Sequence, residues 1–166
     1  MNERRKLINW MAGVTTFIVV LLIVIVLLDR EEDGVSLAAA SRTVALTLES
    51  GDGILENAPE TSNFDEDLSD QWYVKYMDYL YGQGYLDSGS VKADERSATS
   101  AVTYAVLSDW AKKASEEGKG ETDALLSYVD SGDRAKKAVS SENFWKFYDA
   151  FRAAVDPDRA VAEAVF

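Results

Sequence analysis

The sequence predicts a mainly α-helical protein, in which a single N-terminal transmembrane helix is followed by a small all-α domain. Three observations support this fold class. Residues 7–28 contain no charged side chain. Beyond residue 34, apolar residues recur at the spacing of amphipathic helices, and no stretch shows the sustained alternation that is typical of strands. The 166 residues are enough for one membrane anchor and one domain of common size.

The segment from Leu7 to Leu28 has the length and composition of a membrane span. Its 22 residues would form a helix of roughly 33 Å at ~1.5 Å per residue, against a hydrocarbon core of ~30 Å. Trp10 suits the interfacial aromatic belt. A cleaved signal peptide is the less favoured alternative, because the small-residue site at 38–40 lies ten residues beyond the apolar run. We therefore expect residues 7–28 to partner the lipid bilayer.

The charges on either side of this segment predict its orientation. Arg4, Arg5 and Lys6 precede it, whereas an acidic stretch follows it. Basic residues stay on the cytoplasmic side of a span. The expected organisation is a cytoplasmic tail (1–6), a transmembrane helix (7–28), an acidic tether (29–34) and an extracytoplasmic domain (35–166) of a single-pass cell-membrane protein.

Composition excludes several classes of function. After residue 28 the chain holds 14 basic and 28 acidic residues, so it should repel nucleic acid, whose binding needs clustered cations. The same charge should repel anionic lipid head groups. Without Cys or His, the chain cannot form disulfides, Ser-His-Asp or Cys-His catalytic sites, or the usual zinc sites. We expect no enzymatic activity, no catalytic residues, no metal site and no cofactor.

Helix caps and breakers divide the outer domain into helices and loops. The expected first half contains a helix capped by Ser36 and ending near Glu49, a loop from Gly51 to about Asn63, and a helix capped by Ser69 that ends at Gly82. In the expected second half, a helix runs from Ser97 to about Lys113, and two short helices follow at 122–129 and near 133–138. A longer helix then runs from Ser140 or Ser141 to Val155, and a last helix runs from Pro157 to about Val165.

The middle of the domain carries a series of residues with the order of a known repeat. In sequence they are Phe64, Asp65, Trp72, Tyr76, Leu80, Gly84, Tyr85 and Gly89, followed by the helix from Ser97. This order resembles the S-layer homology (SLH) repeat, which has an opening Phe-x-Asp, a Trp-bearing helix, a Gly-containing turn and a second helix that begins with Thr-Arg-Ala-Glu. The resemblance covers residues 64–110, and residues 35–50 and 121–155 would supply degenerate flanking units.

The SLH resemblance implies both a fold and a function. The fold is a pseudo-threefold helical spindle, and the function is attachment of an exported protein to secondary cell-wall polysaccharide in a bacterium of the Gram-positive type. The ligand-binding arginine of the family is absent, however, since the corresponding stretches are 36–39, 98–101 and 140–143, none of which contains Arg. A guanidinium recognises a carboxylate through two parallel hydrogen bonds, which other side chains do not reproduce. We therefore expect the scaffold to be retained better than the original ligand site.

Aromatic residues provide the candidate ligand contacts. Trp72, Tyr76 and Leu80 lie one helical turn apart, so they are expected to form the packed face of their helix. Tyr73 and Tyr81 lie off that face and are candidates to stack on a sugar ring. In the last long helix Phe144, Phe147, Tyr148 and Phe151 form the apolar stripe, and Trp145, which lies outside it, is the third candidate.

An acidic cluster at residues 65–67 and 70 allows two interpretations. Hard oxygen ligands suit Ca²⁺, but the cluster lacks the alternating spacing and the bidentate Glu of an EF-hand loop. The favoured interpretation is an acidic loop before a helix N-terminus, where carboxylates are stabilised by the helix dipole.

The leading functional hypothesis is a membrane-tethered, non-enzymatic module of a bacterial envelope protein. Its candidate partners are cell-wall polysaccharide and another envelope protein. The alternative is the N-terminal accessory region of a larger envelope enzyme that acts on peptidoglycan, because the sequence stops at Phe166 just after an apolar helix. A ligand-sensing membrane regulator is less favoured, since the six-residue cytoplasmic tail is too short to signal without a partner.

Overall fold

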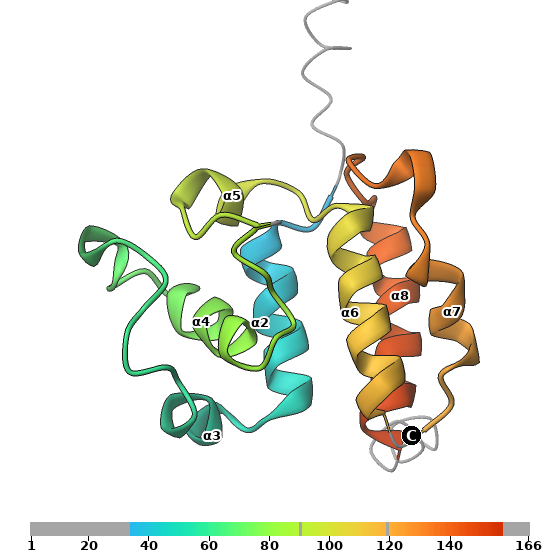
Figure 1. Ribbon diagram of the computed structural model, residues 1–166, viewed down its shortest axis with the longest axis horizontal. Helices are drawn as coiled ribbons and strands as arrows, with labels where there is room; N and C mark the ends of the chain where they lie inside the picture. The colour runs from blue at the N-terminus through green and yellow to red at the C-terminus, as the bar shows by residue number, and fades with distance from the viewer. Residues whose placement is uncertain (1–33, 90, 119, 158–166) are drawn as a thin grey trace, which may run out of the picture. The chain divides into compact units, whose positions relative to one another are not determined.

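A computed structural model describes residues 34–89, 91–118 and 120–157 (Figure 1). The described residues form seven α-helices, two 3-10 helices and three isolated β-bridges, which confirms the all-α prediction for this part of the chain. No helix within it combines the length and apolar character that a membrane span requires. The expected tail (1–6), span (7–28), most of the tether (29–34) and the last helix after Pro157 lie outside the described residues.

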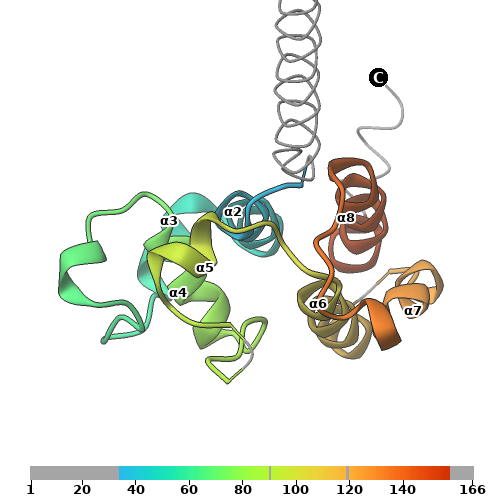
Figure 2. The same ribbon diagram turned by 90° about the horizontal axis from the view of Figure 1, so that it is seen from above.

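The helices keep the labels of Figure 1. Helices α2, α6 and α8 are the longest, and the two views place α6, α7 and α8 side by side, with α2 to α5 grouped together (Figures 1 and 2). The α-helices are α2 (Leu37–Leu48), α3 (Gly51–Glu56), α4 (Val74–Gly82), α5 (Glu95–Thr99), α6 (Tyr104–Glu117), α7 (Asp123–Val129) and α8 (Ser141–Val155). The 3-10 helices are Glu66–Leu68 and Gly132–Arg134.

Three predicted helices have the expected position. Ser36 caps α2 by accepting a hydrogen bond from the Ala39 N–H at 3.3 Å. Ser140 caps α8 in the same way, with the Asn143 N–H as donor at 3.4 Å. Helix α7 also follows its prediction. These helices were predictable because apolar spacing acts locally, as do the hydroxyl caps of α2 and α8.

The predicted loop from Gly51 was wrong at its start, because α3 begins there. Ser50 accepts a hydrogen bond from the Gly53 N–H at 3.1 Å and thereby caps the helix. Asp52 lies in the first turn, where the helix dipole favours a carboxylate. Ile54 is fully buried. A good cap and one buried anchor therefore outweigh the poor helix propensity of two glycines.

The helix predicted from Asp70 begins later than expected. Ser69 is the residue after the 3-10 helix at Glu66–Leu68, and its N–H donates to the Glu66 carbonyl at 3.2 Å. Helix α4 starts only at Val74. Ser69 is thus used to close one turn rather than to open the next helix.

The predicted helix at 97–113 is two helices. Asp94 caps α5 by accepting a hydrogen bond from the Ser97 N–H at 2.7 Å, and α5 ends at Thr99. The chain is extended around Val102 before α6 begins at Tyr104. The region predicted as a helix near 133–138 contains only the 3-10 turn at Gly132–Arg134.

The interruption before α6 belongs to a pattern that occurs three times. A valine precedes the N-cap residue of each of the three longest described helices, and the N-cap residue is always Ser or Thr. The three segments are Val35-Ser36-Leu37 before α2, Val102-Thr103-Tyr104 before α6, and Val139-Ser140-Ser141 before α8. The unit that matches 35–37 in the middle of the chain is therefore 102–104, and not the predicted equivalent stretch at 98–101.

The three segments pair with one another in a closed ring. The Val102 N–H donates to the Val35 carbonyl, and the Val139 N–H donates to the Val102 carbonyl, both at 2.9 Å. In each pair, the residue after one valine bridges to the residue before another. The bridged pairs are Ser36 with Ala101, Thr103 with Ala138, and Ser140 with Gly34. The ring starts the three helices from equivalent positions, which gives the described residues a threefold pattern of backbone pairing.

The core lies along the helices that leave the ring. The fourth residue after each N-cap is fully buried, and these residues are Ala40, Leu107 and Phe144. The largest buried side chains include Trp110, Phe147 and Phe151. Phe147 lies between Trp110 and Phe151, with ring centroids 6.3 and 5.8 Å away. The stripe predicted for the last long helix is therefore the hydrophobic face of α8.

Candidate functional site

A shallow groove of about 360 Å³ lies between α2 and α8. Its volume is near the lower end of small-molecule sites, which span ~300–1,000 Å³. We call it the α2–α8 groove. Its lining residues are Ala39, Arg42, Thr43, Leu46 and Thr47 of α2, Trp72 from the segment before α4, and Tyr148 of α8.

Hydroxyl groups in the groove have fixed directions. The Thr47 Oγ1 donates to the Thr43 carbonyl at 2.9 Å, and it lies 2.8 Å from the hydroxyl of Tyr148. Because a hydroxyl group has one hydrogen, the Tyr148 hydroxyl is then the donor of the second bond. Its oxygen keeps lone-pair capacity toward the groove, so Tyr148 can accept a hydrogen bond from a ligand hydroxyl.

Trp72 forms an exposed wall of the groove, contrary to its predicted place in the packed face of a helix. Its side chain is 50% exposed, and its ring stands edge-on to Tyr73 at 5.7 Å. The reason is the late start of α4 at Val74. Trp72 precedes that helix and is therefore not in helical register with Tyr76 and Leu80. An exposed indole face can stack on a flat apolar surface.

Two cations lie over the ring of Tyr76, and one of them, Arg42, lines the groove together with Trp72. The guanidinium of Arg42 is 5.8 Å from the centroid of the Tyr76 ring, and the Lys75 Nζ is 5.0 Å from the same centroid. Both side chains are exposed, and within the described residues neither of them forms a salt bridge. The groove lining contains no acidic residue. The groove is thus a locally cationic site on a strongly acidic chain.

The structure places two of the three predicted contact residues in structural roles. Tyr73 is only 3% exposed and therefore does not offer a ring face to a ligand. Tyr81 is half-buried, and its hydroxyl donates to the Val91 carbonyl at 3.0 Å. Burial raises the pKa of Tyr81 to about 12, with nearby carboxylates, Asp78 first among them, adding to the effect. Trp145 is 47% exposed and remains available for contact.

The residues that carried the SLH resemblance have mixed environments. Phe64 is buried, and its ring packs edge-on against Tyr73 and Tyr81 at 5.8 and 6.5 Å. Gly84 has a φ of +75°, which favours glycine. Leu80 and Tyr85 are buried, Tyr76 is half-buried and Asp65 is exposed. The Gly89 N–H donates to the Asp87 carboxylate at 3.0 Å.

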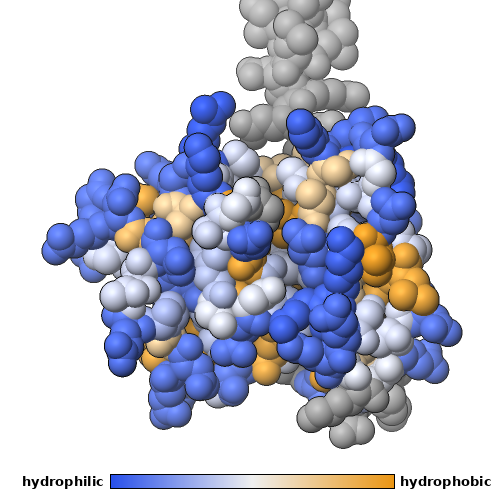
Figure 3. Space-filling model, viewed as in Figure 1, coloured by the Kyte–Doolittle hydropathy of each residue, from blue (hydrophilic) through white to orange (hydrophobic). Residues whose placement is uncertain are grey.

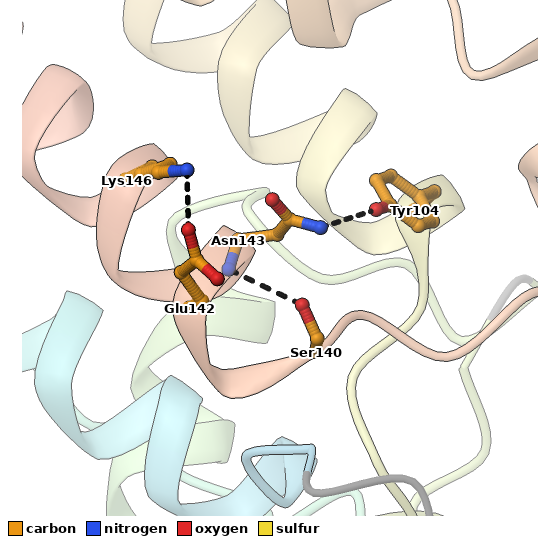
Figure 4. Close-up of polar contacts among 5 residues, drawn as sticks. All are labelled: Tyr104, Ser140, Glu142, Asn143 and Lys146. Atoms are coloured by element: carbon orange, nitrogen blue, oxygen red, sulfur yellow. Dashed lines mark hydrogen bonds and ion pairs between the residues drawn. The ribbon is translucent and has the colours of Figure 1, made fainter.

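A second groove adjoins the first residues of α6 and α8. It has a volume of about 260 Å³ and includes Tyr104, Arg134 and Asn143. The Asn143 Nδ2 donates to the Tyr104 hydroxyl at 3.2 Å (Figure 4), and the Arg134 guanidinium lies 5.1 Å from the Tyr104 ring centroid. These contacts already occupy one face of the Tyr104 ring and an acceptor site of its hydroxyl, and the lining includes an acidic residue, Asp130, which makes this groove a weaker candidate than the α2–α8 groove.

The ion pair in Figure 4 lies on the exposed first turns of α8. Lys146 donates to Glu142 at 2.6 Å. This hydrogen bond lowers the pKa of Glu142 and raises that of Lys146. Since both groups are highly exposed, the pair contributes little to stability.

The described residues contain no group of three or more acidic side chains placed to hold a metal ion, and this includes the acidic stretch at 65–70. The α2–α8 groove instead combines a stacking surface, a guanidinium and a hydroxyl. These groups suit binding of a polar ligand with a flat face, and they offer no nucleophile with a neighbouring base. No protein-family model, curated protein or solved structure matches this chain.

Proposed function

We propose that this protein is a membrane-tethered module of a bacterial envelope that binds cell-wall glycan in the α2–α8 groove. In this proposal residues 7–28 span the membrane and the helical domain lies outside the cytoplasm. The observation that carries the proposal is that Trp72 and Arg42 line the same groove, and that its lining contains no acidic residue. An indole face suits the apolar face of a sugar ring, and a guanidinium suits a carboxylate on the glycan.

The closed ring of three segments supports an SLH-like scaffold. The resemblance implies a threefold arrangement of helices, and the described chain starts α2, α6 and α8 from three cyclically paired segments. Leu37, Tyr104 and Ser141 follow the three N-caps, at the position where the family repeat has its arginine. Arg42, five residues further along α2 than Leu37, provides a guanidinium on a different turn.

Co-sedimentation of the full-length protein with purified cell walls would test this function. The chain would be kept in detergent micelles, and walls stripped of protein would be used, so that a protein partner is removed from the assay. We expect the wild type to sediment with the walls. Trp72→Ala and Arg42→Gln should each weaken binding about tenfold, the factor that corresponds to ~1.4 kcal/mol.

Leu126→Ala provides a matched control. Leu126 is 58% exposed, and α7, the helix that carries it, underlies an apolar patch on the face shown in Figure 3. The residue is absent from the groove lining, so its loss should leave sedimentation unchanged. If the wild type stays in the supernatant, glycan binding is wrong. Capture of another envelope protein through the same groove would then be the function to test, including a role beside a peptidoglycan-acting enzyme.

A further inference from the structure

Helix α8 exposes one large aromatic residue outside its hydrophobic face. Phe144, Phe147 and Phe151 are fully buried, whereas Trp145 is 47% exposed. The Trp145 ring is held in place by edge-on contacts with Phe144 at 5.2 Å and with Tyr148 at 5.6 Å. The side chain is thus exposed but supported by neighbouring rings, so ordering it on a ligand costs little additional conformational entropy.

Tyr148 connects Trp145 to the α2–α8 groove. The Tyr148 side chain lines the groove, in which Trp72 forms another wall. Trp145 is absent from that lining but contacts the Tyr148 ring. Among the described residues the two exposed tryptophans, Trp72 and Trp145, are therefore connected through Tyr148, which shares the groove lining with Trp72 and contacts the ring of Trp145.

The charges differ between the two ends of this surface. At the groove, Arg42 is free of salt bridges among the described residues. Beside Trp145, the Lys146 ammonium is already paired with the Glu142 carboxylate at 2.6 Å. A carboxylate on a ligand is therefore favoured in the groove, while a neutral sugar is favoured over Trp145.

We infer that Trp145 is a second stacking platform, and that the bound glycan is an extended, carboxylate-bearing chain rather than a terminal sugar. One sugar ring stacks on Trp72 with its carboxylate on Arg42, and the chain then passes over Tyr148 so that a later ring stacks on Trp145. This inference depends on the proposed glycan function. It adds a minimum length for the ligand, and it names Trp145 as the residue that distinguishes long from short glycans.

Calorimetric titration with glycans of graded length would test the second platform. The full-length protein in detergent micelles would be titrated with peptide-free peptidoglycan strands, from disaccharide to octasaccharide, whose muramic acid residues carry a lactyl carboxylate. We expect the affinity of the wild type to rise about tenfold once the chain is long enough to reach Trp145. Trp145→Ala should remove this gain and leave the affinity for the disaccharide unchanged, whereas Trp145→Phe should restore part of it.

Trp72→Ala and Arg42→Gln separate the two claims, because they should weaken binding at every length. Leu126→Ala again serves as the control for loss of an exposed apolar side chain. Affinity that does not depend on length, with normal disaccharide binding, would overturn the second platform and leave the proposed function intact. If Trp145→Ala weakens the affinity equally at all lengths, the second platform is also wrong, because Trp145 would then act by positioning the ring of Tyr148. If no strand binds the wild type although the wild type still sediments with purified walls, the extended carboxylate-bearing strand is wrong and the proposed function stands. If the wild type also fails to sediment with the walls, the proposed glycan function itself is overturned.

Discussion

The hydroxyl groups of Thr47 in α2 and Tyr148 in α8 lie 2.8 Å apart, although 101 positions separate these residues along the chain. The bond joins the first described long helix to the last one at the candidate groove. It therefore links the stability of the fold to the geometry of the groove.

We expect Tyr148→Phe and Thr47→Val to destabilise the protein by about 1 kcal/mol each, the usual net value of a hydrogen bond. The double variant should cost less than the sum, with a coupling energy of ~0.5–1.5 kcal/mol, because either change already breaks the bond. Urea unfolding of the four proteins measures this cycle. Strict additivity would show that the two hydroxyls do not interact in solution.

The connection between α6 and α7 requires glycine where it meets the end of α8. The Gly120 N–H donates to the Ala154 carbonyl at 2.8 Å, and a Cβ at residue 120 would come within 2.1 Å of the Ala153 carbonyl oxygen. Gly120→Ala should therefore destabilise the protein by at least ~2 kcal/mol, since backbone would have to move.

Gly51→Ala is the matched control for this substitution. A Cβ at Gly51 would meet nothing within 4 Å, and the residue opens α3. We expect a change between zero and a gain of ~1 kcal/mol, because alanine favours a helix and restricts the unfolded chain. Thermal unfolding of both variants tests the pair. Equal melting temperatures would contradict the close approach at residue 120.

A buried carboxylate organises the loop before the first 3-10 helix. Asp78 of α4 is 5% exposed, and it accepts hydrogen bonds from the Ser62 hydroxyl and from the Asn63 N–H, the latter at 2.9 Å. Hydrogen bonds to a charged group contribute ~1.5–3 kcal/mol. Asp78→Ala should cost about 2–3 kcal/mol in urea unfolding, whereas Asp70→Ala, at an exposed carboxylate, should change stability by less than ~0.5 kcal/mol. Similar losses in the two variants would refute the organising role of Asp78.

Alkaline pH should destabilise the protein through its buried tyrosines. Burial raises the pKa of Tyr81 from 10.0 to about 12, so the unfolded chain loses this proton at a lower pH than the folded chain. The stabilising contribution of the protonated group is complete below pH ~10 and is lost as the pH rises through about 12. Tyr81→Phe should reduce the fall in urea midpoint over this range.

Other tyrosines limit how much of that fall a single variant removes. The pKa values of Tyr73, Tyr79, Tyr85 and Tyr128 are also raised, in each case mainly by burial. Tyr148→Phe provides a control that removes a different tyrosine hydroxyl. If Tyr81→Phe and the wild type lose stability in parallel between pH 10 and 12, the Tyr81 hydroxyl is not protected in the folded state.

Local signals were sufficient for α2, α7 and α8. Each has apolar residues at helical spacing, and Ser36 and Ser140 supply caps that act within three residues. The prediction of one helix at 97–113 was wrong, because residues 100–103 are not helical and separate α5 from α6. The backbone there bonds to residues far away in sequence, such as the Leu37 N–H that donates to the Ser100 carbonyl at 2.8 Å.

The candidate site depended more strongly on tertiary structure. The exposure of Trp145 was predictable, because this residue lies outside the apolar stripe of a helix with a clear register. Trp72 and Tyr73 exchanged their expected environments, because α4 begins at Val74 and helical register does not extend back to them. Arg42 was not among the predicted contact residues, although its position as the one basic residue between Arg30 and Lys75 is visible in the sequence.

By itself the sequence determined the helical class of the described residues, the caps of α2 and α8, and the apolar stripe of α8. These properties depend on neighbours within a few residues, so the local sequence is enough to predict them. Only the tertiary structure decided where α4 and α6 begin, which tryptophans are exposed, and that Arg42, Trp72 and Tyr148 line one groove. Those outcomes depend on long-range backbone pairing in the ring and on packing between helices. The pattern of residues along the chain does not say which distant residues come into contact.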